Sequence, residues 1–166
     1  MALVRTLVTA PTVASYTSLA NSATNVASSS AVTVGTTTNV ADHDVIVTLT
    51  GPVAMTAAAS TMVNLYVYGS IDGTNFSGSN TVNELTGSDS AVVWSPNGNQ
   101  AIYIGSILMT TTTTVASIIY RSKRLSIAAA FGGSLPAKYV IIAQNQSSAA
   151  LAATGHSIAI YELSFS

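Results

Sequence analysis

The chain contains no cysteine and very little charge. Without cysteine, neither a disulfide framework nor thiol chemistry is possible, so the fold must depend on packing and hydrogen bonds. Charged residues make up 7% of the 166 residues, against about 25% in ordinary domains. A surface of Ser, Thr, Asn and Gln offers little repulsion between copies. This composition is typical of a protein that packs against neighbours, or of a secreted domain that faces glycans.

Long hydrophobic runs are also missing. No run of about 18 apolar residues exists, and even residues 127–142 are interrupted by Ser134, Pro136 and Lys138, so we expect no transmembrane helix. Polar residues and proline break the N-terminal segment, so we expect no cleaved signal peptide. Five Lys and Arg residues and a net charge of −1 do not make the basic surface that nucleic acid requires.

Short apolar segments with a period of two alternate with polar turns along the chain. The clearest is residues 62–70, where Val63, Leu65 and Val67 share one face of an extended chain. Asp72-Gly73 then predicts a turn, because Gly tolerates positive φ and Asp bonds to its own backbone. The other predicted strands are residues 2–9, 31–35, 45–50, 91–94, 101–109 with a continuation over 110–114, 115–122, 139–145 and 156–165.

These eight or nine strands, at spacings of about 8–15 residues, predict an all-β fold, and specifically an antiparallel β-sandwich. The Gly, Ser and Asn turns between the strands favour a jelly roll. Residues 31–166 are expected to form the sandwich domain. Residues 1–30 are set apart as an N-terminal arm or weak strands. After the predicted strand at residues 2–9, residues 12–30 show no strong period, and an extended arm, weak strands and a loop over the domain's surface all stay open for them.

Metal-ligand residue types cluster at Asp42-His43-Asp44. Adjacent residues of a strand point to opposite faces, so the two Asp side chains would share a face that His43 leaves. Calcium or zinc would need further ligands at a recognisable spacing, so we interpret the cluster as a solvated turn before residues 45–50. Residues 71–75 lack the acidic repeat of a calcium loop and predict a hairpin turn. We therefore predict no metal site and no cofactor.

The sequence shows no recognisable constellation of catalytic residues. Its two imidazoles, His43 and His156, lie among abundant serines, so that chance proximity carries no weight. The chain has no G-x-S-x-G elbow and no carboxylate pair in the apolar context of a glycosidase. We therefore predict no catalytic residue and no enzymatic activity.

Two further groups of residues are candidates for binding. Tyr66, Tyr68, Trp94 and Tyr103 would suit a sugar-stacking platform, although packing in the core is the favoured interpretation of these aromatic residues. Residues 121–124 form the basic run Arg-Ser-Lys-Arg. That run would meet phosphate or acidic groups of a partner, and a solvated strand end is the favoured interpretation.

A family resemblance rests on the C-terminal third of the chain. The shared features are Phe131-Gly132-Gly133, Leu135-Pro136, a strand of the YVII type, the turn at Asn145 and the stretch Ala150-Leu151-Ala152. With residues 68–76 (YGSIDGTNF), this pattern resembles small virion proteins encoded by tailed bacteriophages. It covers about half of the chain, and its motifs are structural turns rather than chemistry.

The resemblance implies a jelly-roll sandwich that decorates a virion, most specifically a capsid cement protein on the capsid surface. Such a protein binds the shell of major capsid protein and stabilises contacts between capsomers as a homo-oligomer, with a trimer favoured. Residues 1–30 would act as a clasp that adds a strand to a neighbour. A tail, baseplate or fibre-associated subunit and a carbohydrate-binding receptor-recognition domain are the alternatives, and neither nucleic acid nor a membrane is an expected partner.

Overall fold

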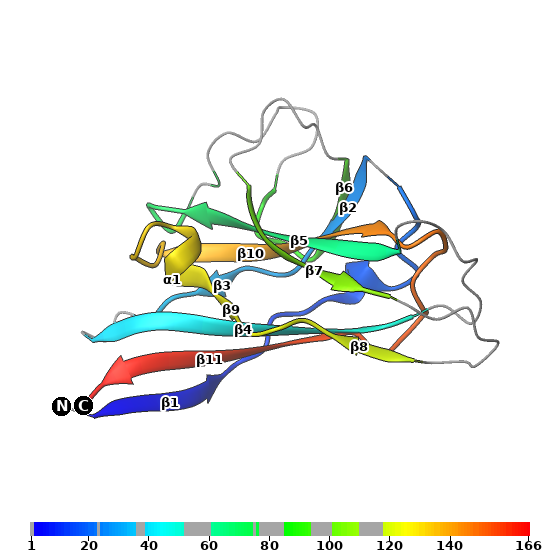
Figure 1. Cartoon of the computed structure of the whole chain (residues 1–166). Helices are drawn as coiled ribbons and strands as arrows, with labels where there is room; N and C mark the ends of the chain where they lie inside the picture. The colour runs from blue at the N-terminus through cyan, green and yellow to red at the C-terminus, as the bar shows by residue number, and fades with distance from the viewer. Residues whose placement is uncertain are drawn as a thin grey trace.

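Two antiparallel β-sheets pack face to face in the computed structural model (Figure 1). It describes residues 2–22, 24–35, 39–51, 61–74, 76, 85–93, 101–109 and 118–166. The predictions made for residues 94 and 110–117 lie outside these described residues. The predicted all-β antiparallel sandwich is confirmed, and the finer jelly-roll assignment stays a prediction.

Each sheet takes strands from along the whole chain. Sheet A contains β1 (Leu3–Val8), β4 (Val40–Thr50), β8 (Ile119–Arg121), β9 (Leu125–Ser126) and β11 (Ser157–Phe165). Sheet B contains β2 (Asn25–Ser28), β3 (Val32–Thr33), β5 (Met62–Ser70), β6 (Ser90–Val93), β7 (Ile102–Leu108) and β10 (Lys138–Gln146). The order is β1-β11-β4-β8 in sheet A, with β9 also on β4, and β6-β2-β10-β5-β7 in sheet B, with β3 also on β10.

The main core lies between the sheets and follows the period of two in each strand. Sheet B contributes Val63, Leu65, Val67, Tyr139, Ile141 and Ala143, and sheet A contributes Val45, Val47, Leu49, Ile158 and Ile160. All of these side chains are buried. The alternation seen in the sequence therefore marks the residues that face the opposite sheet.

A second, smaller core covers the other face of sheet B. Val26, Tyr68, Val140 and Ile142 project from that face and pack against Phe76 and Leu85, which come from the connection between β5 and β6. The rings of Tyr68 and Phe76 stack with their centroids 5.9 Å apart. Because of this second core, β10 is buried on both of its faces.

Residues 1–30, for which an arm and strands were both open, contribute β1 to sheet A and β2 to sheet B. Between these strands, the one-turn 3-10 helix η1 (Ala14–Tyr16) inserts Tyr16 into the main core. The hydroxyl of Tyr16 donates to the carbonyl of Ile141 at 2.9 Å. Asp89 accepts hydrogen bonds from the backbone N–H groups of Ala14, at 2.5 Å, and Ser15, at 2.8 Å. The N-terminal segment is therefore joined to both layers.

The other helix, α1 (Ile127–Ala130), leads into the Phe131-Gly132-Gly133 motif. Ser126 caps it, because its side chain accepts a hydrogen bond from the backbone N–H of Ala129 at 3.0 Å. Beyond the helix, the ring of Phe131 lies against Gly69 of β5, where an added Cβ would come within 2.7 Å of the ring. The Phe131-Gly132-Gly133 motif therefore covers part of sheet B at Gly69.

Candidate functional site

The Asp42-His43-Asp44 cluster lies inside β4, so its interpretation as a solvated turn is wrong. The strand begins at Val40, five residues before the predicted start, because β11 pairs with it along this stretch. Asp42 accepts hydrogen bonds from the backbone N–H of Ala128 at 2.8 Å and from the hydroxyl of Ser126. These bonds fix α1 against sheet A. The carboxylate of Asp42 therefore has a structural role.

The neighbouring Asp44 also has a structural role, because it forms an ion pair. Its carboxylate lies 3.2 Å from the guanidinium of Arg124, which belongs to the predicted basic run. No group of three or more His, Asp or Glu side chains among the described residues is arranged to hold a metal ion. The two aspartates therefore position α1 and the loop that carries Arg124.

His43 points into the main core, and its side chain is 1% exposed. Its Nδ1 lies 2.8 Å from the hydroxyl of Tyr139, while its Nε2 is 3.8 Å from the carboxylate of Glu162 and has no hydrogen-bond partner. Burial lowers the pKa of His43, and the nearby Glu162 and Asp42 oppose this shift without reversing it. The imidazole is therefore neutral near pH 7 and behaves as a core residue that titrates at acidic pH.

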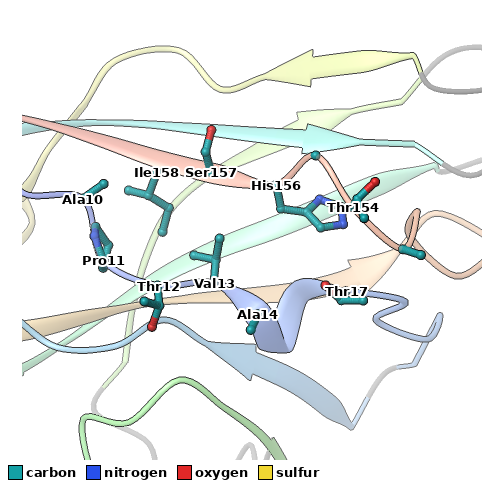
Figure 2. A pocket seen from close by; sticks show the side chains of 12 residues that line it. Ala10, Pro11, Thr12, Val13, Ala14, Thr17, Thr154, His156, Ser157 and Ile158 are labelled. Atoms are coloured by element: carbon teal, nitrogen blue, oxygen red, sulfur yellow. The ribbon is translucent and has the colours of Figure 1, made fainter.

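His156, the second imidazole, lines a groove of about 390 Å³ between residues 10–17 and the start of β11 (Figure 2). Its Nδ1 accepts a hydrogen bond from the backbone N–H of Thr50 at 3.3 Å. Its Nε2 then donates to the carbonyl of Ala152 at 2.8 Å. Both ring nitrogens are used inside the fold, so this imidazole holds the loop before β11 and is a poor candidate for a catalytic base.

The four aromatic residues of the predicted platform separate in the structure. Tyr68 is buried in the second core, as the packing interpretation expected, and Trp94 lies outside the described residues. Tyr66 and Tyr103 come together on neighbouring strands, with centroids 5.6 Å apart in an edge-to-face arrangement. Tyr103 is 56% exposed. A pair of tyrosines, rather than a platform of four, is thus available on the outer face of sheet B.

Side-chain amides surround this tyrosine pair. The Oε1 of Gln144 accepts hydrogen bonds from the hydroxyl of Tyr66, at 3.2 Å, and from the Nδ2 of Asn64, at 3.4 Å. The same Nδ2 lies 3.2 Å from the Oε1 of Gln146. The resulting patch is polar and uncharged, and one aromatic ring rises from it. These are the chemical features of a surface that stacks on a neutral polar ligand.

The free edge of sheet A carries more exposed apolar side chains than any other strand of the described residues. Leu3 and Leu7 of β1 are 61% and 62% exposed, and Val4 of the same strand is exposed as well. Leu3 pairs with Phe165 of β11, which is also exposed. On the other side of β1, no strand of the described part of the chain pairs with it. We call β1 with this unpaired side the β1 edge.

Elsewhere in the described residues, exposed apolar side chains also lie mainly on the edge strands of the two sheets. Nine large hydrophobic side chains of the described residues are exposed, and seven of them lie on strands at the edges of the two sheets. They are Leu3, Val4 and Leu7 on β1, Val93 on β6, Tyr103 and Leu108 on β7, and Ile119 on β8. Unpaired strand edges are the places where another chain most readily adds a strand, so these residues mark candidate association surfaces.

Sequence reasoning identified the strand at residues 2–9 but not its place at an edge. Strand order depends on pairing between segments about 160 residues apart, here β1 and β11, and alternating apolar residues do not reveal it. The one available signal was Arg5, the single charged residue of the strand. Its guanidinium lies 3.7 Å from the centre of the Tyr161 ring, on the outer face of sheet A.

Comparison with protein-family models, with curated proteins and with solved structures finds no match to this chain. Within the described residues, no helix is long and apolar enough to cross a membrane.

Proposed function

We propose that this chain is a non-enzymatic structural subunit of a bacteriophage virion, and specifically a cement protein that binds the capsid shell and joins neighbouring subunits. The observation that carries the proposal is the concentration of exposed apolar residues on strand edges, above all at the β1 edge. In a domain with so few charges, such edges favour association with copies of itself and with a coat.

The mechanism of such a protein is binding. Each square ångström of apolar surface buried in a contact contributes about 25 cal/mol before the costs of association are subtracted. A single contact at one strand edge is therefore weak. Repetition of the same contact over a shell converts weak contacts into high avidity, which is how a small sandwich would stabilise capsomers.

We also propose that the sandwich is a jelly roll. With β3, β6 and β9 set aside as additional strands, eight strands remain, which are β1, β2, β4, β5, β7, β8, β10 and β11. They form two sheets of four, and the chain crosses between the sheets at every connection except the one from β5 to β7. Crossing connections of this kind, with the last strand lying beside the first, support a jelly roll.

The test is the amount of the protein in purified virions relative to the major capsid protein, measured by quantitative mass spectrometry. A cement protein is expected at a copy number comparable to that of the capsomers. A copy number of a few per particle would instead support the tail or baseplate alternative. Absence from purified virions would contradict the proposal.

Carbohydrate binding is a second candidate function, and the Tyr66–Tyr103 pair with its surrounding amides is the observation that favours it. The patch lacks charge, so a neutral glycan suits it better than an acidic one. A glycan array probed with the wild type and with Tyr103→Ala tests this function. Binding that disappears in the variant would support it, and an array with no signal for either protein would contradict it.

A further inference from the structure

We propose that the β1 edge pairs with the β1 edge of a second copy, in an antiparallel contact whose two-fold axis passes through Thr6. The inference rests on the proposed function, because it names the partner of one of the association surfaces. It specifies which residues face one another, so it can fail while the proposed function stands.

The backbone of β1 has hydrogen-bonding groups available for such a contact. Ala2 and Ser166 exchange both backbone hydrogen bonds, at 3.1 and 3.0 Å. In an antiparallel ladder the directly bonded pairs alternate, so Val4, Thr6 and Val8 also bond to β11. The N–H and C=O groups of Leu3, Arg5 and Leu7 therefore point away from β11, to the unpaired side.

Protein edge strands are commonly protected from other chains by proline, lysine, a bulge or a very short length. The β1 edge has six residues, no proline, no lysine and no break in its register with β11. Its single charge, on Arg5, lies over the Tyr161 ring. The guanidinium is thus held on the outer face of sheet A, where it leaves the backbone edge open.

The side-chain pattern of β1 suits a second copy of the same strand. With Thr6 opposite Thr6, Val4 lies opposite Val8 of the second copy, and Leu7 lies opposite its Arg5. Thr–Thr and apolar cross-strand pairs are favourable, and Leu7 meets the aliphatic part of the arginine. Centring the contact on Arg5 would instead place two positive charges directly opposite each other, which is destabilising.

A matched pair of charge variants tests this register. Leu7→Lys would place a second positive charge opposite Arg5 of the other copy, whereas Leu7→Glu would place a negative charge there. Both variants are equally polar, and the site is exposed in the single chain. We expect the dimer of Leu7→Lys to dissociate at about tenfold higher concentration than the dimer of Leu7→Glu, measured by analytical ultracentrifugation. Equal dissociation constants would overturn the inference.

A single-cysteine variant provides an independent test, since the chain has no cysteine of its own. Residues facing each other at a non-hydrogen-bonded position are about 4.5 Å apart at Cα, within the range of a disulfide. Thr6→Cys should therefore form a disulfide dimer under mild oxidation. Thr33→Cys is the control, because Thr33 is exposed on β3 in the other sheet. Cross-linking of Thr6→Cys no greater than that of the control would overturn the inference.

The outcomes also separate this inference from the proposed function. A wild-type trimer in which Thr6→Cys does not cross-link overturns the β1 pairing and leaves the virion role standing. A wild type that is monomeric in solution but abundant in virions has the same meaning. A β1-paired dimer that is absent from virions supports the pairing and contradicts the proposed function.

Discussion

Strands β10 and β1 have similarly apolar sequences, but they occupy opposite environments. In β10, the seven residues between the two ends are all buried, because one face meets the main core and the other meets the second core. In β1, every residue except Val8 is exposed. Apolar residues in a strand of this chain are therefore covered at the centre of a sheet and left exposed at its edge.

The difference in burial follows from the place of each strand in its sheet and from the connection that covers β10. β10 lies between β2 and β5 in the middle of sheet B, and the β5–β6 connection covers its outer face. β1 is the last strand of sheet A, held by β11 on one side (Figure 1). An apolar residue contributes to the stability of the single chain only where other residues cover it. The largest effects on stability are thus expected in β10 and the smallest in β1.

The largest expected effect is that of Ile141→Ala in β10. Ile141 is fully buried in the main core, so the loss of its side chain leaves a cavity and should lower the free energy of unfolding by about 2–5 kcal/mol. Leu7→Ala in β1 is the matched control, with an expected change of about 0.5 kcal/mol or less. Urea denaturation at low protein concentration measures both. Similar losses for the two variants would remove the distinction between the strands.

A smaller effect is expected for Gly69→Ala in β5, opposite Tyr139 of β10. The new Cβ would lie 2.7 Å from the Phe131 ring and 3.1 Å from the Cβ of Pro136. Overpacking of this kind costs about 1–3 kcal/mol, which thermal denaturation would show as a lower Tm. Adding Phe131→Leu should recover part of the loss. If the double variant is no more stable than Gly69→Ala, the clash is not with Phe131.

A third prediction concerns His43, which joins β4 of sheet A to β10 through Tyr139. Burial lowers the pKa of His43 below its ordinary value of about 6.5, so the unfolded chain binds this proton more tightly than the folded chain does. Stability should therefore fall as pH decreases from about 6.5 toward the lowered pKa, and this contribution should be constant above about pH 7.

The comparison of the wild type with His43→Gln isolates this effect from the carboxylates. Glutamine does not titrate, so its free energy of unfolding should fall less between pH 7 and pH 5 than that of the wild type. Denaturant titrations across this range measure the two slopes. Parallel pH profiles would show that some other group causes the loss at acidic pH.

The sequence was sufficient for the fold class and for most of the strands. Alternation over residues 62–70 located β5 to the residue, and the apolar run at residues 139–145 located β10 within one residue at each end. Both strands lie in the middle of a sheet, where local pattern and final environment agree. The same reasoning placed Asp42–Asp44 in a turn, because polar residues next to each other usually mark one. These residues instead belong to β4, because the strand pairs with β11 along them and because the backbone of α1 donates a hydrogen bond to Asp42.

The candidate association surface could not be predicted from the sequence in the same way. Whether Leu3 and Leu7 are covered depends on which strand lies beside β1, and that is a property of the whole chain. The pairing of Tyr66 with Tyr103 likewise depends on the register between β5 and β7, which shifts by an irregularity next to Tyr66. Low charge predicted that the protein associates with neighbours, and it did not predict which surface would be involved.

A further small effect is expected at Arg5, which lies over the Tyr161 ring and so links β1 to β11. Arg5→Met keeps much of the aliphatic side chain and removes the charge, so the loss should be that of an exposed cation–π contact, about 0.5–1 kcal/mol. A double-mutant cycle with Tyr161→Leu, measured by urea denaturation, separates the contact from the other effects of each substitution. Because so little free energy holds this side chain, a coupling energy of zero would mean that β1 is attached to the sandwich by its backbone ladder, and that the arginine is free to meet a neighbouring chain.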